Sequence, residues 1–460
     1  MLKELLTPEI LELIELRSWA SIREVLQSWS PAEIADLMLG VKKQDRVFLY
    51  RALGRDIGVE VFSYLEPDDQ DQLLVDLTDQ ETRDLLAELP PDDRTDLLEE
   101  LPGAVSHRLL SLLSPEDLRE ARWLMGYPEE SVGRFMTPDF VAVRAGMNVA
   151  EAIEHIKRHG QDSETINRIY VLDERGSLLD DIMLRTIILA DEQMYIRDLM
   201  DQNVISISAF DDQEVAVRTM EKYDLPAIPV VDSTGILVGI VTFDDIFDIA
   251  QEEATEDIQK LGGMEALDDT YRATNILELV RKRAGWLSIL MVSELMTTSV
   301  LAFFEGTIER AAVLVLFIPL VMSSGGNSGS QAASLIIRAL ALDEIRLQDW
   351  WLVMRREIIS GFLLGLILGG IGFARIELWA MAGATTFGPH HMLVACTVAL
   401  TLVGIVLWGT IAGSMLPFVL KKMGFDPAVS SAPFVATLVD VFGIIIYFAV
   451  ALVILNGTLL

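Results

Sequence analysis

Long apolar runs alternate with short polar segments in the carboxy-terminal part of the chain. Each run is near or above the length of about 20 residues that a helix needs to cross a bilayer. The pattern therefore predicts a membrane domain of five helices over residues 284–460. We place the spans at residues 284–304, 311–340, 358–380, 392–420 and 430–456.

Basic residues are distributed unevenly over the segments that connect these runs. Three precede the first run, four lie between the second and third, and two separate the fourth from the fifth. They are Arg281, Lys282 and Arg283, then Arg338, Arg346, Arg355 and Arg356, then Lys421 and Lys422. Because basic loops remain in the cytoplasm, we expect a plasma-membrane (inner-membrane) protein with a cytoplasmic amino terminus. An odd number of spans then leaves the carboxyl terminus outside.

Residues 1–130 have a different pattern, in which short segments rich in leucine and acids are broken by prolines. Pro67, Pro91 and Pro115 recur every 24 residues, and each is followed by two acids. Proline fits the first turn of a helix, and acids there complement the helix dipole. A period of this size predicts stacked helical hairpins, that is, an all-α superhelical domain.

A second repeat occupies residues 131–250. The sequence VLDERG at 171–176 recurs as VVDSTG at 230–235, 59 residues later. In both copies a strand meets a turn with glycine, and a second strand and a helix follow. This α/β pattern resembles a tandem pair of CBS modules, which commonly bind adenine nucleotides between the copies.

The resemblance to CBS modules also implies a nucleotide contact. The Thr/Ser-x-x-Asp motif that holds ribose in that family is matched by Thr242 and Asp245 in the second copy. The first copy departs from the motif, because Met183-Leu184-Arg185-Thr186 stands in its place. ATP is therefore a candidate ligand. The alternative is a pair of modules that only transmits movement or dimerises.

Charge divides the chain in the same way as hydropathy. Residues 1–283 hold 28 of the 36 basic and 59 of the 69 acidic residues, and therefore about −31 of the net charge of −33. Self-repulsion of this size destabilises a packed domain unless cations or a partner screen it. Nucleic acid is accordingly excluded as a partner, whereas multivalent cations are favoured.

Residues 251–283 form an acidic linker between the second repeat and the first span. Glu252, Glu253, Glu256 and Asp257 crowd part of one helix surface. Like charges four residues apart destabilise a helix, so a bound cation would compensate them. The alternative is an ordinary solvated helix face.

One acid lies where acids are rare. Asp440 is well inside the last apolar run, where a carboxylate costs roughly 2.5–3.5 kcal/mol on insertion scales. The last run contains no second ionisable group to neutralise it. We therefore expect Asp440 to face a cation pathway; the alternative is a buried hydrogen bond to a neighbouring helix.

The second run carries a segment that an anchoring helix does not need. Pro319 and the glycines of the sequence SSGGNSG at 323–329 are expected to interrupt the helix and free its carbonyl groups. The alternative is close packing of small residues. Carbonyl oxygens and one carboxylate would select a hard cation, and a lone Asp per chain suits hydrated Mg2+ better than Ca2+.

Other chemistry has little support in the sequence. The single cysteine, Cys396, lies in an apolar run, and two adjacent histidines, His390 and His391, are more often surface residues than ligands. No nucleophile motif, Walker loop or HExxH motif appears, so an enzyme is not expected.

Taken together, the order of domains and the sequences PLVMSSGGNSG and VATLVDV resemble the MgtE magnesium channels over essentially the whole chain. The resemblance implies a homodimer in the membrane lipid with its pore on the two-fold axis. It further implies that Asp440 is the pore ligand, near Gly325 and Asn327, and that residues 251–283 form a plug helix which closes the pore when Mg2+ bridges the cytosolic domains.

The same resemblance implies a set of regulatory Mg2+ ligands. They are spread over the helical domain, the second CBS copy, the plug helix and the loop before the last span. The implied ligands are Glu60, Asp92, Asp96, Asp212, Glu214, Asp224, Asp245, Asp248, Glu253, Glu256, Asp257 and Asp426. Two other functions stay open: a broader divalent channel that also passes Co2+ or Mn2+, and a membrane sensor of Mg2+ or nucleotide that does not conduct.

Overall fold

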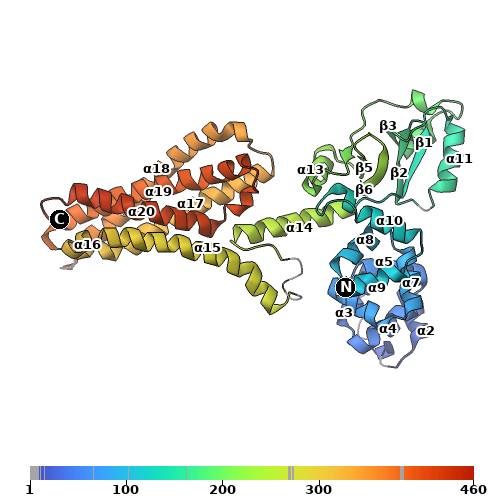
Figure 1. The fold of residues 1–460 in the computed structure, drawn as a ribbon, viewed down its shortest axis with the longest axis horizontal. Coiled ribbons are helices and arrows are strands. Elements are labelled where there is room, and N and C mark those ends of the chain that lie inside the picture. The colour runs from blue at the N-terminus through green and yellow to red at the C-terminus, as the bar shows by residue number, and fades with distance from the viewer. Residues whose placement is uncertain are drawn as a thin grey trace. The chain divides into compact units, whose positions relative to one another are not determined.

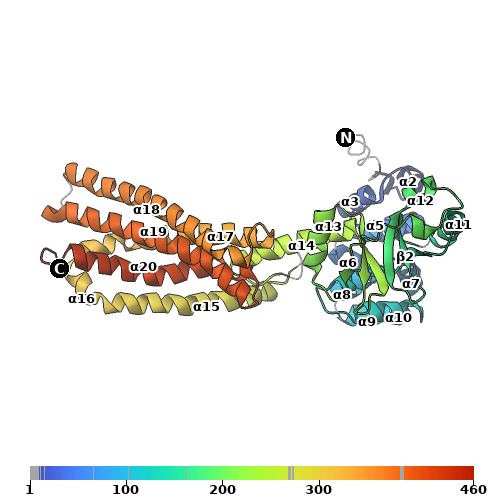
Figure 2. The same ribbon diagram turned by 90° about the horizontal axis from the view of Figure 1, so that it is seen from above.

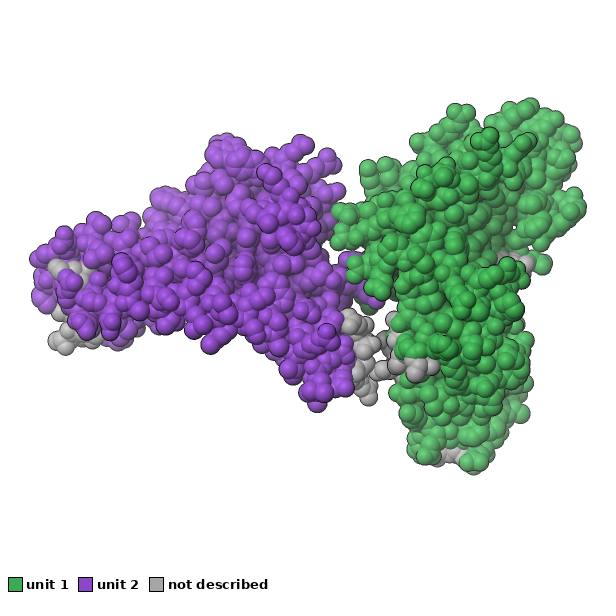
Figure 3. All heavy atoms as spheres, in the orientation of Figure 1, with its two compact units in different colours: residues 1–251 green, residues 252–460 purple. Residues whose placement is uncertain are grey.

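The computed structural model describes residues 10–459 except 11, 15, 66, 102, 162, 268–270, 272, 273 and 384–387. The chain divides into two units, residues 1–251 and 252–460, which Figure 3 colours separately. Each unit has its own hydrophobic clusters.

The first unit begins with short helices that pack on their next-but-one neighbours. Helix α3 contacts α5, α5 contacts α7, and α7 contacts α9, while α2 contacts α4 and α4 contacts α6 (Figure 1). This confirms the predicted superhelix. The helices are α2 Trp19–Leu26, α3 Pro31–Gly40, α4 Lys43–Ala52, α5 Arg55–Ser63, α6 Pro67–Asp76, α7 Asp79–Glu88, α8 Pro91–Glu100, α9 Gly103–Leu112 and α10 Asp117–Leu124. Pro67 and Pro91 start helices as predicted, whereas Pro115 lies two residues before α10.

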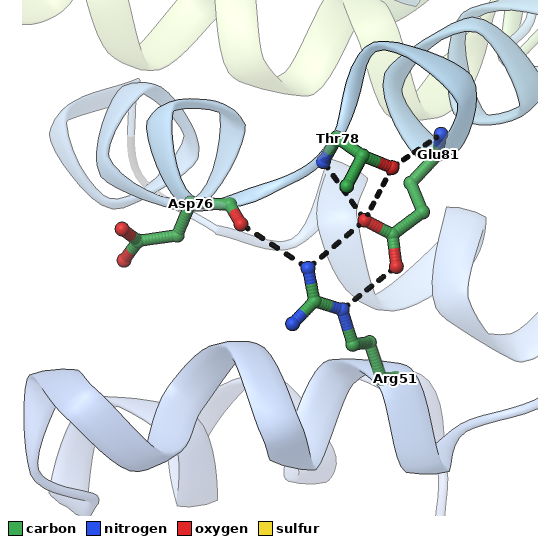
Figure 4. Close-up of polar contacts among 4 residues, drawn as sticks. All are labelled: Arg51, Asp76, Thr78 and Glu81. Carbon is green, nitrogen blue, oxygen red and sulfur yellow. Dashed lines mark hydrogen bonds and ion pairs between the residues drawn. The ribbon is translucent and has the colours of Figure 1, made fainter.

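Polar contacts fix the start of α7 against α4 (Figure 4). The Thr78 hydroxyl accepts a hydrogen bond from the Glu81 N–H at 3.3 Å, and the Glu81 carboxylate accepts one from the Thr78 N–H at 2.8 Å, which forms a capping box. Arg51 donates to Glu81 at 2.7 Å and to the Asp76 carbonyl at 3.3 Å. The hydrogen bond from Arg51 lowers the pKa of Glu81 to about 2. Acids of the helical region are therefore neutralised where a basic partner is present.

Two three-stranded modules follow, and they confirm the predicted α/β repeat. In each module the first two strands are parallel and the last two antiparallel. The first comprises η1 Val132–Arg134, β1 Phe140–Arg144, α11 Val149–His159, β2 Thr165–Leu172, β3 Leu178–Met183, α12 Leu184–Leu189 and η2 Ile196–Asp198. The second comprises β4 Ile207–Ser208, α13 Gln213–Tyr223, β5 Ala227–Val231, β6 Leu237–Thr242 and α14 Phe243–Leu261.

The repeated turns have the same physical basis. Asp173 accepts hydrogen bonds from the N–H groups of Arg175 and Ser177, and Asp232 accepts them from Thr234 and Ile236. The glycine of each turn has a positive φ, +90° at Gly176 and +84° at Gly235, which favours glycine. The two turns also pair with each other, because Leu178 donates to the Gly235 carbonyl and Leu237 to that of Gly176, both at 3.1 Å.

The second unit is a bundle of long helices (Figures 1 and 2). In the described part of the chain five segments are long and apolar enough to span a membrane: 276–303, 312–341, 347–381, 391–422 and 432–454. This confirms the five predicted spans, although the first begins eight and the third eleven residues before its predicted start. The elements are α15 Ile276–Phe303, α16 Glu305–Arg310, η3 Ala312–Phe317, α17 Ile318–Ala341, η4 Leu347–Asp349, α18 Trp350–Met381, η5 Gly388–His390, α19 His391–Lys422, η6 Pro427–Val429 and α20 Ala432–Ile454.

The predicted interruption of the second span at its glycines is wrong. Helix α17 is continuous from Ile318 to Ala341, and Pro319 lies in its first turn, where a missing N–H costs nothing. The irregular backbone precedes the glycines, in the 3₁₀ helix Ala312–Phe317. The glycine carbonyls are thus part of a helix rather than freed for a cation.

Close packing, the alternative, explains the glycines. A Cβ atom at Gly413 of α19 would lie 2.1 Å from the carbonyl oxygen of Gly329 of α17, and one at Gly409 would lie 2.6 Å from that of Gly325. Both helices thus place glycines four residues apart at their contact. Small residues at this spacing let helix backbones approach closely in a membrane.

We expect Gly413→Ala to lower the stability of the membrane domain, because the added methyl group must push α17 and α19 apart. Overpacking of this kind costs about 1–3 kcal/mol. The measurement is the thermal unfolding midpoint of detergent-solubilised protein, which should fall by several degrees. The control is Gly370→Ala on α18, where a Cβ meets nothing within 4 Å. Equal midpoints for the two variants would contradict the packing role.

Candidate functional site

Asp440 lies in the middle of α20, and its carboxylate has an unsatisfied oxygen. Oδ1 is buried and has no hydrogen-bond partner in the described structure. The alternative of a hydrogen bond to a neighbouring helix is therefore not seen for this atom. Helices α15, α17 and α19 all pack against α20. A buried acceptor without a donor costs free energy, so this oxygen is suited to a cation.

The two residues predicted near Asp440 differ from each other in their surroundings. Gly325 is buried, and a Cβ there would meet Ile405 at 2.3 Å and Val439 at 2.8 Å, so its role in this structure is packing. Asn327 is exposed on α17, and its side-chain amide donates to the Ser323 hydroxyl at 3.3 Å. Asn327 therefore presents polar groups on a face of α17 that this single chain does not cover.

A lysine in the last turn of α14 forms an ion pair with the segment before the last membrane helix. Lys260 forms ion pairs with Glu256 at 2.5 Å and with Asp426 at 2.8 Å. Burial by itself lowers the pKa of Lys260. The hydrogen bonds from its ammonium group to these two carboxylates, together with their charges, have the larger combined effect, so the pKa is raised overall. In this arrangement an ammonium group bridges two of the residues predicted to share Mg2+. Glu253 and Asp257 lie on the same helix.

Acids from three parts of the first unit meet in what we call the acidic interface. It comprises residues from the start of α8, from the first module and from the start of α14. They are Asp92 and Asp93, Asp139 and Glu164, and Asp244, Asp245 and Asp248; each interacts electrostatically with at least one other. Asp92 is 7% exposed, and its Oδ1 has no partner in the described structure.

At five of the seven acids of the acidic interface the pKa is raised. Burial, followed by the charges of Asp245, Asp93 and Glu164, raises the pKa of Asp92 well above its usual value. Burial raises the pKa of Asp245 to about 7, although hydrogen bonds from Thr242 oppose the shift. The pKa values of Asp93, Glu164 and Asp248 are raised mainly by burial as well. The interface therefore favours protons or cations.

Sequence reasoning found part of this interface and missed the rest. It proposed Asp92, Asp245 and Asp248, and it missed Asp93, Asp139, Glu164 and Asp244. The immediate sequence neighbours Asp93 and Asp244 could have been suspected from the Asp-Asp pairs. No local signal marks Asp139 or Glu164, because the fold brings the first module to this place.

The other predicted regulatory acids lie elsewhere. Asp212 caps α13 by accepting the N–H of Glu214 at 3.0 Å, and Asp224 ends the same helix in a left-handed conformation. Glu214 pairs with Arg218 at 2.8 Å. Glu60 on α5 and Asp96 on α8 are exposed. Within the described residues, no group of three acidic, histidine or cysteine side chains is placed to chelate one ion.

An open cavity of about 490 Å³ lies on the first module and at the start of β5. Its wall combines two arginines with apolar side chains. The lining residues are Asn167, Arg168, Met183, Leu184, Arg185, Ile188, Leu189 and Pro226. Thr242 and Asp245 do not line it; they hydrogen-bond to each other at 2.5 Å. The cavity therefore uses the segment of the first copy that departs from the ribose motif, Met183-Leu184-Arg185.

Known protein families match each of the three parts of this chain. A divalent cation transporter family, MgtE, matches residues 318–450, the MgtE intracellular N domain matches 29–130, and CBS domains match 132–192 and 196–252. The magnesium transporter MgtE of Thermus thermophilus is 37% identical over 99% of this chain and 100% of its own length. That of Enterococcus faecalis is 31% identical over 96% of this chain and 95% of its own length.

Solved structures agree for the first unit. The cytosolic domain of the Mg2+ channel MgtE in complex with ATP is 36% identical, with a TM-score of 0.51, over 53% of this chain and 99% of that one. The soluble part of a magnesium transporter is 32% identical, with a TM-score of 0.51, over 55% of this chain and 99% of that one.

A multi-pass membrane bundle joined to a helical domain and a CBS pair defines a divalent cation transporter. The identity over the full length is more specific, and the chain belongs to the MgtE family of magnesium transporters. The family resemblance that the membrane motifs suggested is thereby confirmed.

A fall in pH should favour packing of the acidic interface, whereas it would weaken an interface held by ion pairs between acids and bases. Because the packed arrangement raises the pKa values of five of its carboxylates, it binds more protons than the separated one, and a fall in pH favours packing. Without Mg2+, we expect the radius of gyration of the isolated first unit to be larger at pH 8 than at pH 5.5, with the change centred near the pKa of about 7 for Asp245. Small-angle X-ray scattering measures this change.

Two controls accompany the scattering measurement. Saturating Mg2+ should remove the pH dependence, because the cation replaces the protons. The variant Asp92→Asn/Asp245→Asn, which lacks two of the repelling charges, should stay compact at pH 8. A radius that does not change with pH in Mg2+-free wild-type protein would contradict the assignment.

Proposed function

We propose that this magnesium transporter moves Mg2+ past Asp440, in a homodimer whose two chains each contribute this carboxylate. The unpartnered Oδ1 of Asp440 within a membrane span is the observation that carries the proposal. Mg2+ keeps several of its waters and binds one or two carboxylates, which suits one Asp from each chain. The exposed Asn327 supports a second chain opposite α17.

In the proposed orientation the amino terminus is cytoplasmic and the carboxyl terminus is outside. The basic segments before α15, between α17 and α18 and after α19 support this topology. The apolar side chains exposed on α15 and α18 support contact with lipid or a second chain. Mg2+ then enters the cell down its electrochemical gradient, without a chemical reaction.

Cytosolic Mg2+ closes the path in this proposal. The carboxylates of the acidic interface repel each other when they are ionised, and hydrated Mg2+ between them removes the repulsion. A ligand shifts such an equilibrium only through its different affinity for the two states. The linker helix α14 carries Asp244, Asp245 and Asp248 at one end and Lys260 at the other, so it joins the acidic interface to the contact with Asp426.

Replacing Asp440 tests the transport path. We expect Asp440→Ala to lower Mg2+ flux into sealed liposomes at least tenfold, as followed with a Mg2+-sensitive dye inside. The control is Glu309→Ala, an exposed acid on the short helix α16 outside the spans. Unchanged flux in Asp440→Ala would overturn the proposal.

The same liposomes discriminate the two alternatives. A non-conducting sensor predicts no flux in the wild-type protein, and a broader divalent channel predicts that Co2+ or Mn2+ enters as fast as Mg2+.

A second function, nucleotide binding, is supported by the cavity on the first module. A volume of about 490 Å³ is in the range of small-molecule sites, and its apolar wall with Arg168 and Arg185 suits a purine and its phosphates. Arg168 is held by Asp181, which leaves Arg185 as the more available cation. A related cytosolic domain, of an Mg2+ channel MgtE, was solved in complex with ATP. We therefore propose that ATP binds here rather than at Thr242 and Asp245.

Calorimetric titration with ATP separates the two nucleotide positions. Arg185→Ala should weaken ATP binding about tenfold, because one charge-assisted contact to phosphate is lost. Arg175→Ala, an exposed arginine in the repeated turn, is the matched control and should leave the affinity unchanged. If Thr242→Val weakens ATP binding and Arg185→Ala does not, the ribose motif is the site.

A further inference from the structure

Asp440 has an acidic neighbour on another membrane helix. Glu294 lies within α15, and its carboxylate is the charged group that acts electrostatically on Asp440. Glu294, like Asp440, is a lone acid in an apolar segment, and the sequence reasoning that singled out Asp440 passed over it. Its relation to Asp440 depends on how α15 packs against α20.

Two aromatic contacts show that Glu294 and Asp440 lie at similar depth. Trp286, in the first half of α15, meets Phe434 near the start of α20, with ring centroids 6.4 Å apart. Phe304, at the end of α15, stacks on Phe448 in the second half of α20 at 4.6 Å. The two helices therefore run side by side in the same direction. At about 1.5 Å per residue, Glu294 lies roughly 12 Å beyond Trp286 and Asp440 roughly 9 Å beyond Phe434. The difference is less than one helical turn.

A buried hydroxyl lies one turn further along α15. Thr297 follows Glu294 by three residues and therefore shares its helix face. It is 1% exposed, and its hydroxyl has no hydrogen-bond partner in the described structure. The next two residues behave differently, because Thr298 and Ser299 donate to carbonyls one turn back at 3.5 and 3.0 Å. Thr297 thus offers a free oxygen about one turn from Glu294, on the same face of α15.

The two carboxylates have no basic partner. Neither Glu294 nor Asp440 forms an ion pair with a described residue, whereas membrane acids are normally paired or face a polar path. Two like charges close together in apolar surroundings repel each other strongly. A divalent cation between them would reverse the sign of the interaction.

We propose that Glu294, Thr297 and Asp440 together form a cation position that binds Mg2+ in the membrane region. The proposal rests on the proposed role of Asp440 and adds a second carboxylate from α15 and a hydroxyl. All three side chains present oxygen, the donor that Mg2+ prefers. The second charge raises the affinity of the path for a divalent ion, so Glu294 sets the concentration at which transport saturates.

The test is Mg2+ flux into liposomes as a function of external Mg2+. Glu294→Gln should raise the half-saturating Mg2+ concentration about tenfold, which corresponds to about 1.4 kcal/mol. The maximal rate should stay within about twofold. Thr297→Val, of equal size, should raise half-saturation about threefold, and Glu294→Asp, which keeps the charge, should stay close to wild type. These magnitudes follow from the loss of one charge or one dipole near a divalent ion.

Matched variants separate this inference from the proposed function. Glu309→Gln on α16 and Thr298→Val, the exposed neighbour of Thr297, should leave half-saturation unchanged. If Asp440→Ala abolishes flux but Glu294→Gln and Thr297→Val transport like wild type, the inference is overturned and the role of Asp440 stands. If Asp440→Ala also transports normally, the proposed path itself fails. Should Glu294→Gln protein not fold, Thr297→Val alone decides, and unchanged half-saturation overturns the inference.

Discussion

Repulsion between neighbouring carboxylates is the interaction on which this structure depends. It occurs at the acidic interface, where Asp92 and Asp245 are acted on by the charges of other acids, and again in the membrane between Asp440 and Glu294. Elsewhere in the chain, acids are paired with arginines. Arg51 donates a hydrogen bond to Glu81, and the buried Arg94 donates one to Glu120 at 2.6 Å. Groups of acids thus lie at the two places where we propose that a cation is sensed or moved, and a multivalent cation is the simplest group that stabilises both.

The rest of the fold keeps these charges in place against their repulsion. In the first unit, Arg134 donates to the carbonyls of Met125 and Tyr127 and pairs with Glu99 of α8, which ties the helical region to the first module. In the second unit, Gly329 and Gly413 bring α17 and α19 into backbone contact. Such packing is insensitive to cations. A change in Mg2+ concentration can thus alter the spacing of the charges without melting the elements that carry them.

The sequence allowed most of the fold to be predicted, and less of the site. Hydropathy marked the five spans, and the recurring Asp-x-x-Gly turns marked the modules, because these signals are local. The glycines of α17 were misinterpreted, since a glycine that frees a carbonyl and one that admits another helix look alike until Gly409 and Gly413 are seen opposite. The meeting of Glu294 with Asp440, the place of Glu164 and the cavity at Arg185 depend on which distant segments meet, and no local pattern reports that.

Helix α14 explains how the two groups of charges can influence each other. It begins at Phe243, directly after β6, and carries Asp244 and Asp245 in its first turn. It continues without a break to Leu261, which packs on the membrane core, and the preceding residue, Lys260, pairs with Asp426. A helix of 19 residues is about 28 Å long and stiff. Any rearrangement of the acidic interface that moves its first turn must therefore strain or move its last one. In the proposed mechanism, coupling through one continuous helix needs no chain of intermediate side chains, and the ion pairs of Lys260 are the point where the movement would reach the membrane.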